Sequence, residues 1–97
     1  MKLCYVIQLS EIKIAIADIH EYLGGYRISR INVPQGYRGR GHGSELLRRI
    51  TRDADEERAP LYLEPSESGG LTHSQLVDWY KRNSFVEFEQ GLKRLPQ

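Results

Sequence analysis

The sequence predicts an α+β fold in which one mixed β-sheet carries two helices. Three observations predict it. The first 33 residues show alternating apolar positions without a helical period, and the later part of the chain contains two apolar stripes at helical spacing. Short apolar runs follow each stripe, so strands and helices alternate there. With 97 residues, the whole chain, 1–97, is expected to form a single domain.

The first part of the chain is expected to form an antiparallel meander of three strands. Apolar residues alternate over 2–9 and again over 11–20. Gly24-Gly25 is a turn signal, and a third strand is expected at 26–33.

The third strand contains an irregularity. Its apolar residues stand at even positions in Tyr26 and Ile28, but at odd positions in Ile31 and Val33. A β-bulge between 28 and 31 would change parity in this way, and bulges often re-aim a strand beside an active site. A strand with both faces partly buried is the alternative.

The first helix is expected at 43–58, where Pro60 ends it because proline cannot continue the hydrogen-bond ladder. A short strand at 61–64 follows. The helix has the right length for a crossover, so this strand should run parallel to the third. The apolar stripe of the helix consists of Leu46, Leu47, Ile50 and Ala54.

A loop is expected at 65–70, and a capping box at Thr72 opens a second helix over 72–83. Two strands, at 85–89 and 92–95, should close the chain as a hairpin. The expected order is therefore βββαβαββ, an α+β arrangement with one mixed sheet.

Charge and cysteine content limit the function classes. The formal net charge of +1 argues against a dedicated nucleic-acid binder. Cys4 is the single cysteine, and its apolar neighbours suggest a buried small hydrophobe in a reducing compartment. The sequence shows neither a signal peptide nor an apolar run near the ~20 residues that span a membrane. We therefore expect a cytoplasmic protein without a membrane partner.

The most informative stretch is VPQGYRGRGHGS at 33–44, between the third strand and the first helix. It is rich in glycine, which permits positive φ and lets a ligand approach the backbone. Free N–H groups at a helix start, together with the helix dipole, attract anions. The stretch therefore predicts a binding site for a pyrophosphate.

Three phosphate-binding patterns compete for this stretch. A P-loop requires a lysine after its glycines, and none follows here. A dinucleotide fingerprint requires G-x-G-x-x-G between parallel strands, whereas antiparallel strands are expected before Gly39-x-Gly41-x-Gly43. Arg38-x-x-Gly41-x-Gly43 instead resembles the [Q/R]-x-x-G-x-[G/A] pyrophosphate motif of the GCN5-related N-acetyltransferase (GNAT) superfamily, which also links a strand to a helix.

A second segment resembles the same family. LVDWYKRNSF at 76–85 is similar to the family's L-x-x-[FW]-Y-x-x-x-G-F, except that Ser84 stands where glycine is usual. If this position needs a positive φ, serine costs about 1 kcal/mol or more. The resemblance covers residues 3–95, because the expected strand order also agrees, and it favours a bulge at 28–31.

The resemblance implies a GNAT-like sheet that lacks the strand and two helices usual ahead of the meander, as in small phage-encoded acetyltransferases. It also implies acetyl-CoA as co-substrate. Main-chain groups of Ile31, Asn32 and Val33 would hold the pantetheine arm and the thioester. The residues implied for the pyrophosphate are Arg38, Gly39, Arg40, Gly41, His42, Gly43 and Ser44.

Catalytic roles also follow from the resemblance. Tyr80 corresponds to the tyrosine that protonates the leaving thiolate, and a core aromatic on an amphipathic helix is the alternative. Glu64, at the end of the strand beside the thioester, is the first candidate for the general base. Asp18, His20 and Glu21 come next, and an ordered water is a further option.

Two histidines and three arginines are not expected to take part in catalysis. His42 and His73 lack a third ligand at metal spacing, so no metal is expected. Arg48, Arg49 and Arg52 are expected to be solvated, with contact to the adenosine phosphate or an anionic partner as the alternative.

Together these observations predict an N-acetyltransferase that moves acetyl from acetyl-CoA directly to an amine, without a covalent enzyme intermediate. An acceptor site without the usual helices would be open, which favours a protein lysine or N-terminus over a small amine. A homodimer is another way to close this open acceptor site. The alternatives are a non-catalytic acyl-CoA-binding regulatory module and an arginine-glycine nucleic-acid binder, against which the near-neutral charge weighs.

Overall fold

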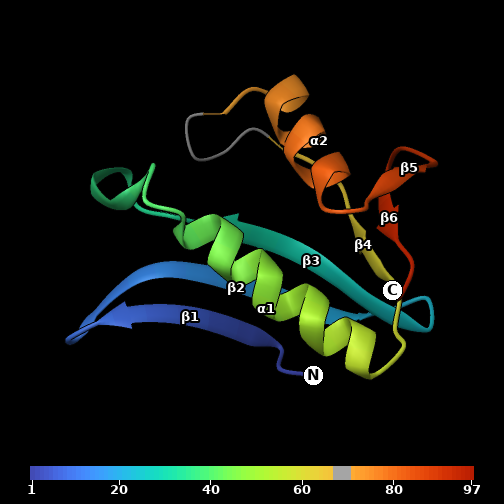
Figure 1. Cartoon of the computed structure of the whole chain (residues 1–97), viewed down its shortest axis with the longest axis horizontal. Coiled ribbons are helices and arrows are strands. Elements are labelled where there is room, and N and C mark those ends of the chain that lie inside the picture. The colour runs from blue at the N-terminus through green and yellow to red at the C-terminus, as the bar shows by residue number, and fades with distance from the viewer. Residues whose placement is uncertain (67–70) are drawn as a thin grey trace.

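A computed structural model describes residues 1–66 and 71–97 of the chain. Its sheet has six strands in the order β1-β2-β3-β4-β6-β5 (Figure 1). The strands are β1 (Cys4–Leu9), β2 (Ile12–Tyr22), β3 (Gly25–Asn32), β4 (Leu61–Leu63), β5 (Val86–Phe88) and β6 (Gly91–Arg94). The helices are the 3-10 helix η1 (Gln35–Tyr37), α1 (His42–Glu56) and α2 (His73–Arg82). The predicted α+β class and strand order are confirmed, and the predicted loop at 65–70 lies outside the described residues from 67 onward.

The bulge predicted in the third strand is present. β2 and β3 pair antiparallel, and their register shifts between Asp18, which faces Arg30, and Ile19, which faces Ile28. Ser29 is therefore an extra residue in β3. The extra residue allows Ile28 and Ile31, which are an odd number of positions apart, both to pack toward the core.

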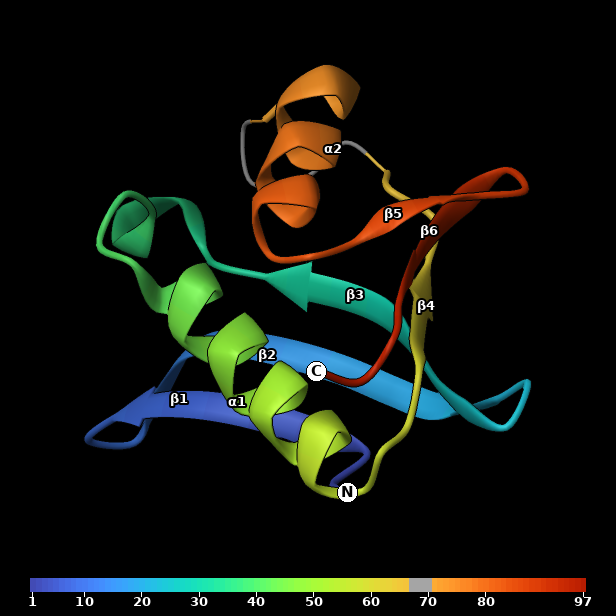
Figure 2. The same ribbon diagram turned by 45° about the vertical axis from the view of Figure 1, so that its right-hand side comes forward.

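β3 and β4 run parallel, as predicted, but they diverge soon after they meet. Only Tyr26 and Arg27 of β3 pair with β4, opposite Leu61 and Tyr62, in the part of the chain that the structure describes. β3 continues to Asn32, beyond the last paired residue. The two strands therefore enclose a wedge, and Figure 2 shows α2 near its wide end.

The core lies between one face of the sheet and the two helices (Figures 1 and 2). α1 crosses in front of β2, and its predicted apolar stripe is fully buried. Burial of each leucine or isoleucine in this stripe stabilises the fold by about 1.5–3 kcal/mol. The largest fully buried side chains are Phe85, Leu46, Leu47, Ile50 and Leu61.

The opposite face of the sheet carries no helix within the described residues (Figures 1 and 2). Cys4 belongs to this face because it alternates with Tyr5, which lies in the core. Cys4 is exposed, so the prediction of a buried cysteine was wrong. An apolar run in an edge strand does not by itself show which of its faces is covered.

The helix termini largely follow the sequence signals. α1 ends at Glu56, slightly earlier than predicted, because Arg58 adopts a left-handed conformation with φ 55°. The capping box of α2 is present: the Gln75 N–H donates to the Thr72 hydroxyl at 3.2 Å, and the Thr72 N–H donates to the Gln75 side chain at 2.9 Å. Ser84 has φ 73°, so this position does require the left-handed conformation that glycine adopts more easily.

Candidate functional site

Three neighbouring cavities form a row across the diverging strands. The loop cavity, of about 300 Å³, lies at the start of α1. The wedge cavity, of about 230 Å³, lies between β3 and β4. The open-face groove, of about 460 Å³, lies beside β4, β5 and β6. Tyr80 lines the first two cavities and Glu64 lines the last two, so both predicted catalytic side chains stand at junctions of the row.

The loop cavity is shaped by backbone conformation. Gly39 and Gly41 have φ values of 79° and 82°, in the left-handed region. A Cβ added to Gly41 would meet no protein atom within 4 Å, so the missing side chain leaves open space. Arg38 donates from Nε to the Val33 carbonyl oxygen at 2.8 Å, a bond that holds the loop against the end of the strand.

The free N–H groups at the start of α1 give this cavity the character of an anion site. It brings together most of the residues predicted for coenzyme binding, namely Ile31, Val33, Arg38, Gly39, Gly41, His42, Gly43 and Ser44. Asn32 lines the wedge cavity instead. Arg40 lies outside this lining, with its guanidinium 5.6 Å from the centre of the Tyr37 ring.

The apolar wall of the loop cavity was not identified from the sequence. It is formed by Leu71, Leu76 and Trp79, of which the last two come from α2. The helical stripe of α2 marked Leu76 and Trp79 as apolar but could not show whether they face the core or a cavity. The wall suits the uncharged part of a ligand whose charged part lies at the loop.

Tyr80 is held by its aromatic neighbours. Its ring centre lies 4.8 Å from that of Trp79 and 5.3 Å from that of Phe85, and the residue is 7% exposed. Burial raises the pKa of Tyr80 to about 12. The phenol is therefore protonated at neutral pH, and it can act as a proton donor to a group in either cavity that it lines.

Glu64 and Tyr80 both line the wedge cavity. The carboxylate of Glu64 lies 3.4 Å from the Arg27 guanidinium, and the Glu64 side chain is 63% exposed. An exposed ion pair of this kind is weak, so Arg27 does not hold the carboxylate firmly in place.

The other candidate bases do not line the wedge cavity. Asp18 pairs with Arg30 at 3.0 Å, and the Nδ1 of His20 lies 2.8 Å from the Ser29 hydroxyl oxygen. Glu21 lines a separate cavity near the β2–β3 turn. Among the four residues considered for this role, the geometry favours Glu64.

An aromatic row lines the open-face groove, and the sequence analysis did not identify it. Tyr22 meets Tyr62 edge-on with ring centres 5.3 Å apart, and Phe88 lies 5.7 Å from Tyr62. Glu89 also lines the groove. The available signal was that Tyr62 stands between two core leucines of β4 and so must point to the opposite face.

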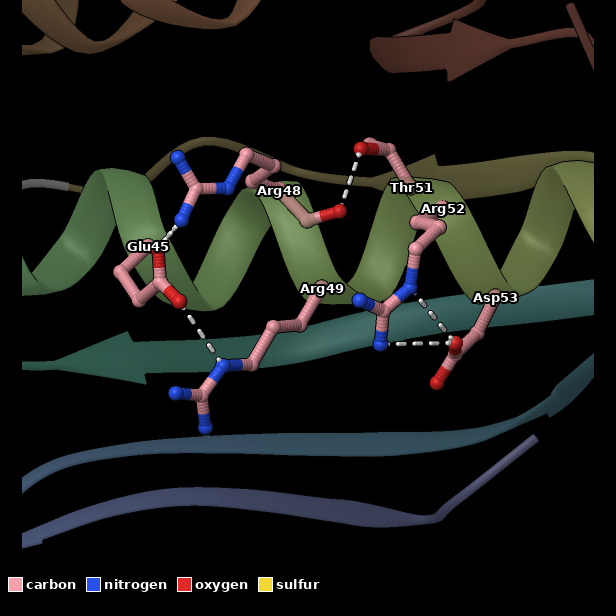
Figure 3. Close-up of polar contacts among 6 residues, drawn as sticks. All are labelled: Glu45, Arg48, Arg49, Thr51, Arg52 and Asp53. Atoms are coloured by element: carbon pink, nitrogen blue, oxygen red, sulfur yellow. Dashed lines mark hydrogen bonds and ion pairs between the residues drawn. The ribbon is translucent and has the colours of Figure 1, made fainter.

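The three arginines of α1 form an exposed charged row, as expected. Figure 3 shows Arg48 and Arg49 paired with Glu45, and Arg52 paired with Asp53 at 3.5 Å. None of the three lines the loop cavity.

His73 lines a further cavity, which shares Glu89, Gln90, Gly91 and Leu92 with the open-face groove. Within residues 1–66 and 71–97, no three histidine, cysteine or acidic side chains lie close enough to bind a metal ion. No helix in this part of the chain has the length and apolar character to cross a bilayer.

Neither a protein-family model nor a curated protein matches the sequence. Solved structures match it across nearly its full length, and the chain has the fold of the GNAT acetyltransferases. The anti-CRISPR protein AcrVA5 matches at 19% identity with a TM-score of 0.69, over 93% of this chain and 95% of that one.

Two larger acetyltransferases also match. PaiA N-acetyltransferase of Thermoplasma acidophilum, solved with coenzyme A, has 14% identity and a TM-score of 0.68, over 96% of this chain and 60% of that one. The ribosomal-protein-S18-alanine N-acetyltransferase of Escherichia coli has 17% identity and a TM-score of 0.75, over 94% and 64%. The chain therefore spans less than two thirds of both.

Proposed function

We propose that the chain, as one domain over residues 1–97, is an N-acetyltransferase that moves acetyl from acetyl-CoA to an amine. The observation that carries the proposal is the row of cavities: an anion-binding loop, a wedge between diverging strands, and a buried tyrosine where the two meet. These three features suit the phosphate groups, the extended arm and the reactive end of a phosphorylated carrier, in that order. PaiA shares the fold and was solved with coenzyme A, which supports the assignment.

In this proposal the pyrophosphate of acetyl-CoA accepts hydrogen bonds from the loop at 38–44. The pantetheine arm lies along β3 at Ile31, Asn32 and Val33, beyond the point where β3 pairs with β4. A main-chain N–H of this segment would donate to the thioester carbonyl oxygen. Such a bond stabilises the negative charge that develops on this oxygen during attack.

The chemistry is direct transfer. The amine nitrogen attacks the thioester carbonyl carbon, a C–N bond forms and the C–S bond breaks. Tyr80 gives its proton to the leaving thiolate, and the proton released by the amine goes to Glu64, directly or through a water. Proton exchange with solvent then returns both side chains to their starting states. Cys4 takes no part, because it lies in β1 and lines none of the three cavities.

The open-face groove is the proposed acceptor site. It joins the wedge cavity at Glu64, and its aromatic rings can pack against the stem of a lysine or attract its ammonium group. A groove on a face without a helix in the described residues suits a large partner, so we propose a protein lysine or N-terminus as acceptor. The S18-alanine acetyltransferase, whose name records a protein acceptor, supports this choice. A second copy of the chain is another way to wall the groove.

The single unpaired cysteine suits the cytoplasm, where thiols remain reduced. The reaction would therefore take place in that compartment.

The test is an acceptor screen with acetyl-CoA and the purified chain. One arm contains proteins, including a CRISPR nuclease because AcrVA5 is an anti-CRISPR protein, and the other contains polyamines and aminoglycosides. Release of the coenzyme thiol and mass increase of the acceptor are measured together. We expect acetylation of a protein amine, with one thiol released per acetyl group transferred.

Each other outcome has a defined meaning. Efficient acetylation of a small amine without any modified protein would contradict the protein acceptor and favour a small-amine acetyltransferase. Binding of acetyl-CoA without turnover on either panel would favour the acyl-CoA-binding regulatory module. Absence of binding to the folded chain would refute the proposed function altogether.

A further inference from the structure

β1 is an edge strand without the usual protection against pairing. It ends the sheet, and no strand among the described residues pairs with its outer side. Its sequence, CYVIQL, contains neither a charged residue nor a proline, the two devices that commonly block an edge. The register shift between β1 and β2 leaves Ile14 as an extra residue in β2. Because the bulge lies in β2, β1 itself is not interrupted and its outer side stays regular.

The hydrogen-bond pattern identifies the residues that face outward. The Ile19 N–H donates to the Leu3 carbonyl oxygen at 2.9 Å, so Leu3 bonds toward β2. In an antiparallel ladder this direction alternates along the strand. Tyr5 and Ile7 therefore also bond toward β2, and three residues direct their N–H and C=O groups away from the sheet: Cys4, Val6 and Gln8.

We propose that β1 pairs antiparallel with β1 of a second copy of this chain, about a two-fold axis at Val6. In this register Val6 faces Val6 of the second copy, and Cys4 faces Gln8. All three outward-facing residues then exchange hydrogen bonds with an outward-facing partner. A shift of two residues in either direction would leave one of the three outward-facing residues of each copy without an outward-facing partner. This register therefore pairs the most backbone N–H and C=O groups along the edge.

The exposed apolar residues at the ends of β1 fit the same register. Leu3 is 55% exposed and Leu9 is 60% exposed. The two-fold axis places Leu3 of one copy opposite Leu9 of the other, at both ends of the ladder. Facing side chains in antiparallel strands lie about 4.5–5.5 Å apart at Cβ, so each pair removes apolar surface from water.

Charges on α1 also become complementary. The Tyr5 hydroxyl donates to Asp53 at 2.5 Å, which places Asp53 on the side of α1 that lies toward β1. Arg49 lies one turn earlier, and Figure 3 shows both side chains on the side of α1 that faces the strands. Because β1 and α1 run in opposite directions, the two-fold axis sets Arg49 of one copy near Asp53 of the other.

The helices themselves would not touch. α1 crosses β2, so three strand spacings separate it from α1 of the second copy, about 14 Å. Packed helices lie at 8–10 Å, so only an extended side chain such as Arg49 can bridge the gap. The short ladder buries less than the roughly 800 Å² per partner of a standard interface, and we expect a reversible dimer in the micromolar range or weaker. The wedge between β3 and β4 stays open in this dimer.

Oxidative crosslinking of Gln8→Cys tests the register. The introduced thiol would face Cys4 of the second copy, with Cα atoms about 5.5 Å apart, within the range of a disulfide. Within one chain the two positions are about 13 Å apart and cannot be bridged. Mild oxidation should convert the variant to a covalent dimer, and Ser10→Cys, shifted by two residues, should stay largely monomeric. A monomeric Gln8→Cys, or equal crosslinking of both variants, would overturn the proposal.

A proline substitution tests the interface without crosslinking. The Val6 N–H points outward, so Val6→Pro removes a donor from the proposed interface but none from the β1–β2 ladder. Val6→Thr is the matched control, because it keeps the donor and the branched shape. Sedimentation equilibrium should show a monomer for Val6→Pro and a monomer–dimer equilibrium for Val6→Thr and the unmodified chain. An unmodified chain that stays monomeric at millimolar concentration contradicts the inference. If Val6→Pro does not fold, the crosslinking result decides.

Discussion

Replacing Tyr80 by phenylalanine isolates the proposed proton transfer. The change removes one oxygen and keeps the ring that packs against Trp79 and Phe85. Tyr80 lines two cavities, and its hydroxyl makes no hydrogen bond within the described residues, so its loss should have little effect on stability. Loss of a positioned general acid lowers turnover by roughly 10²-fold at the lower end of the usual range. This corresponds to about 2.7 kcal/mol of barrier height.

The assay is release of the coenzyme thiol with a saturating acceptor, followed as a function of pH. Acetyl-CoA affinity, measured by calorimetry, should stay close to that of the unmodified chain. The raised pKa of Tyr80, about 12, has a further consequence. We therefore expect no fall in turnover through ionisation of Tyr80 between about pH 8 and 10.

Tyr26→Phe is the matched control. It removes a hydroxyl that donates to Glu57 at 2.8 Å and that lies outside the row of cavities. Turnover of this variant should equal that of the unmodified chain. Full turnover in Tyr80→Phe would show that Tyr80 is a core residue only, and the proposed proton path would fail.

Three further predictions concern the loop and the stability of the fold. Gly41→Ala should weaken acetyl-CoA binding about tenfold in calorimetry, because it adds a side chain to the lining of the loop cavity at a residue with a positive φ. Gly36→Ala, outside this lining, should bind normally. Ser84→Gly should raise the free energy of unfolding by about 1 kcal/mol in urea titrations, because it relieves the left-handed backbone; an unchanged value would contradict the strain. Hydrogen bonds from Arg94 hold the pKa of Asp55 below its usual range, so their stabilisation is present above about pH 4 and is lost as the pH falls. Asp55→Asn should therefore lower the free energy of unfolding by about 2 kcal/mol at pH 7, the usual contribution of hydrogen bonds to a charged group, and should make stability fall less below pH 4. If the stability of the variant and of the unmodified chain changed with pH in the same way, these hydrogen bonds would not be the cause.

The sequence predicted the fold well because several local signals agreed. The parity switch between Ile28 and Ile31 required an extra residue if both were to face the core, and Ser29 is that residue. The capping box at Thr72 and the stripe of α1 each depend on neighbours within one or two turns. Features of this kind are local, so a single sequence contains the information needed to predict them.

Features that depend on distant strands were harder to predict. Cys4 has apolar neighbours, yet it is exposed because the described residues place no helix on its face of the sheet. The aromatic row of Tyr22, Tyr62 and Phe88 comes from β2, β4 and β5. These strands do not pair with one another, and only the assembled sheet brings their rings together. The divergence of β3 from β4, which opens the wedge, likewise depends on where pairing stops and not on either strand alone.

Calorimetric titration of the folded chain with acetyl-CoA tests the proposed coenzyme site most directly. The loop cavity and the wedge cavity share Tyr80, and we expect them to act as one site per chain. Binding should be saturable with a stoichiometry of one, and free coenzyme A should compete for it. A folded chain that neither binds acetyl-CoA nor gains thermal stability in its presence would contradict the proposed site.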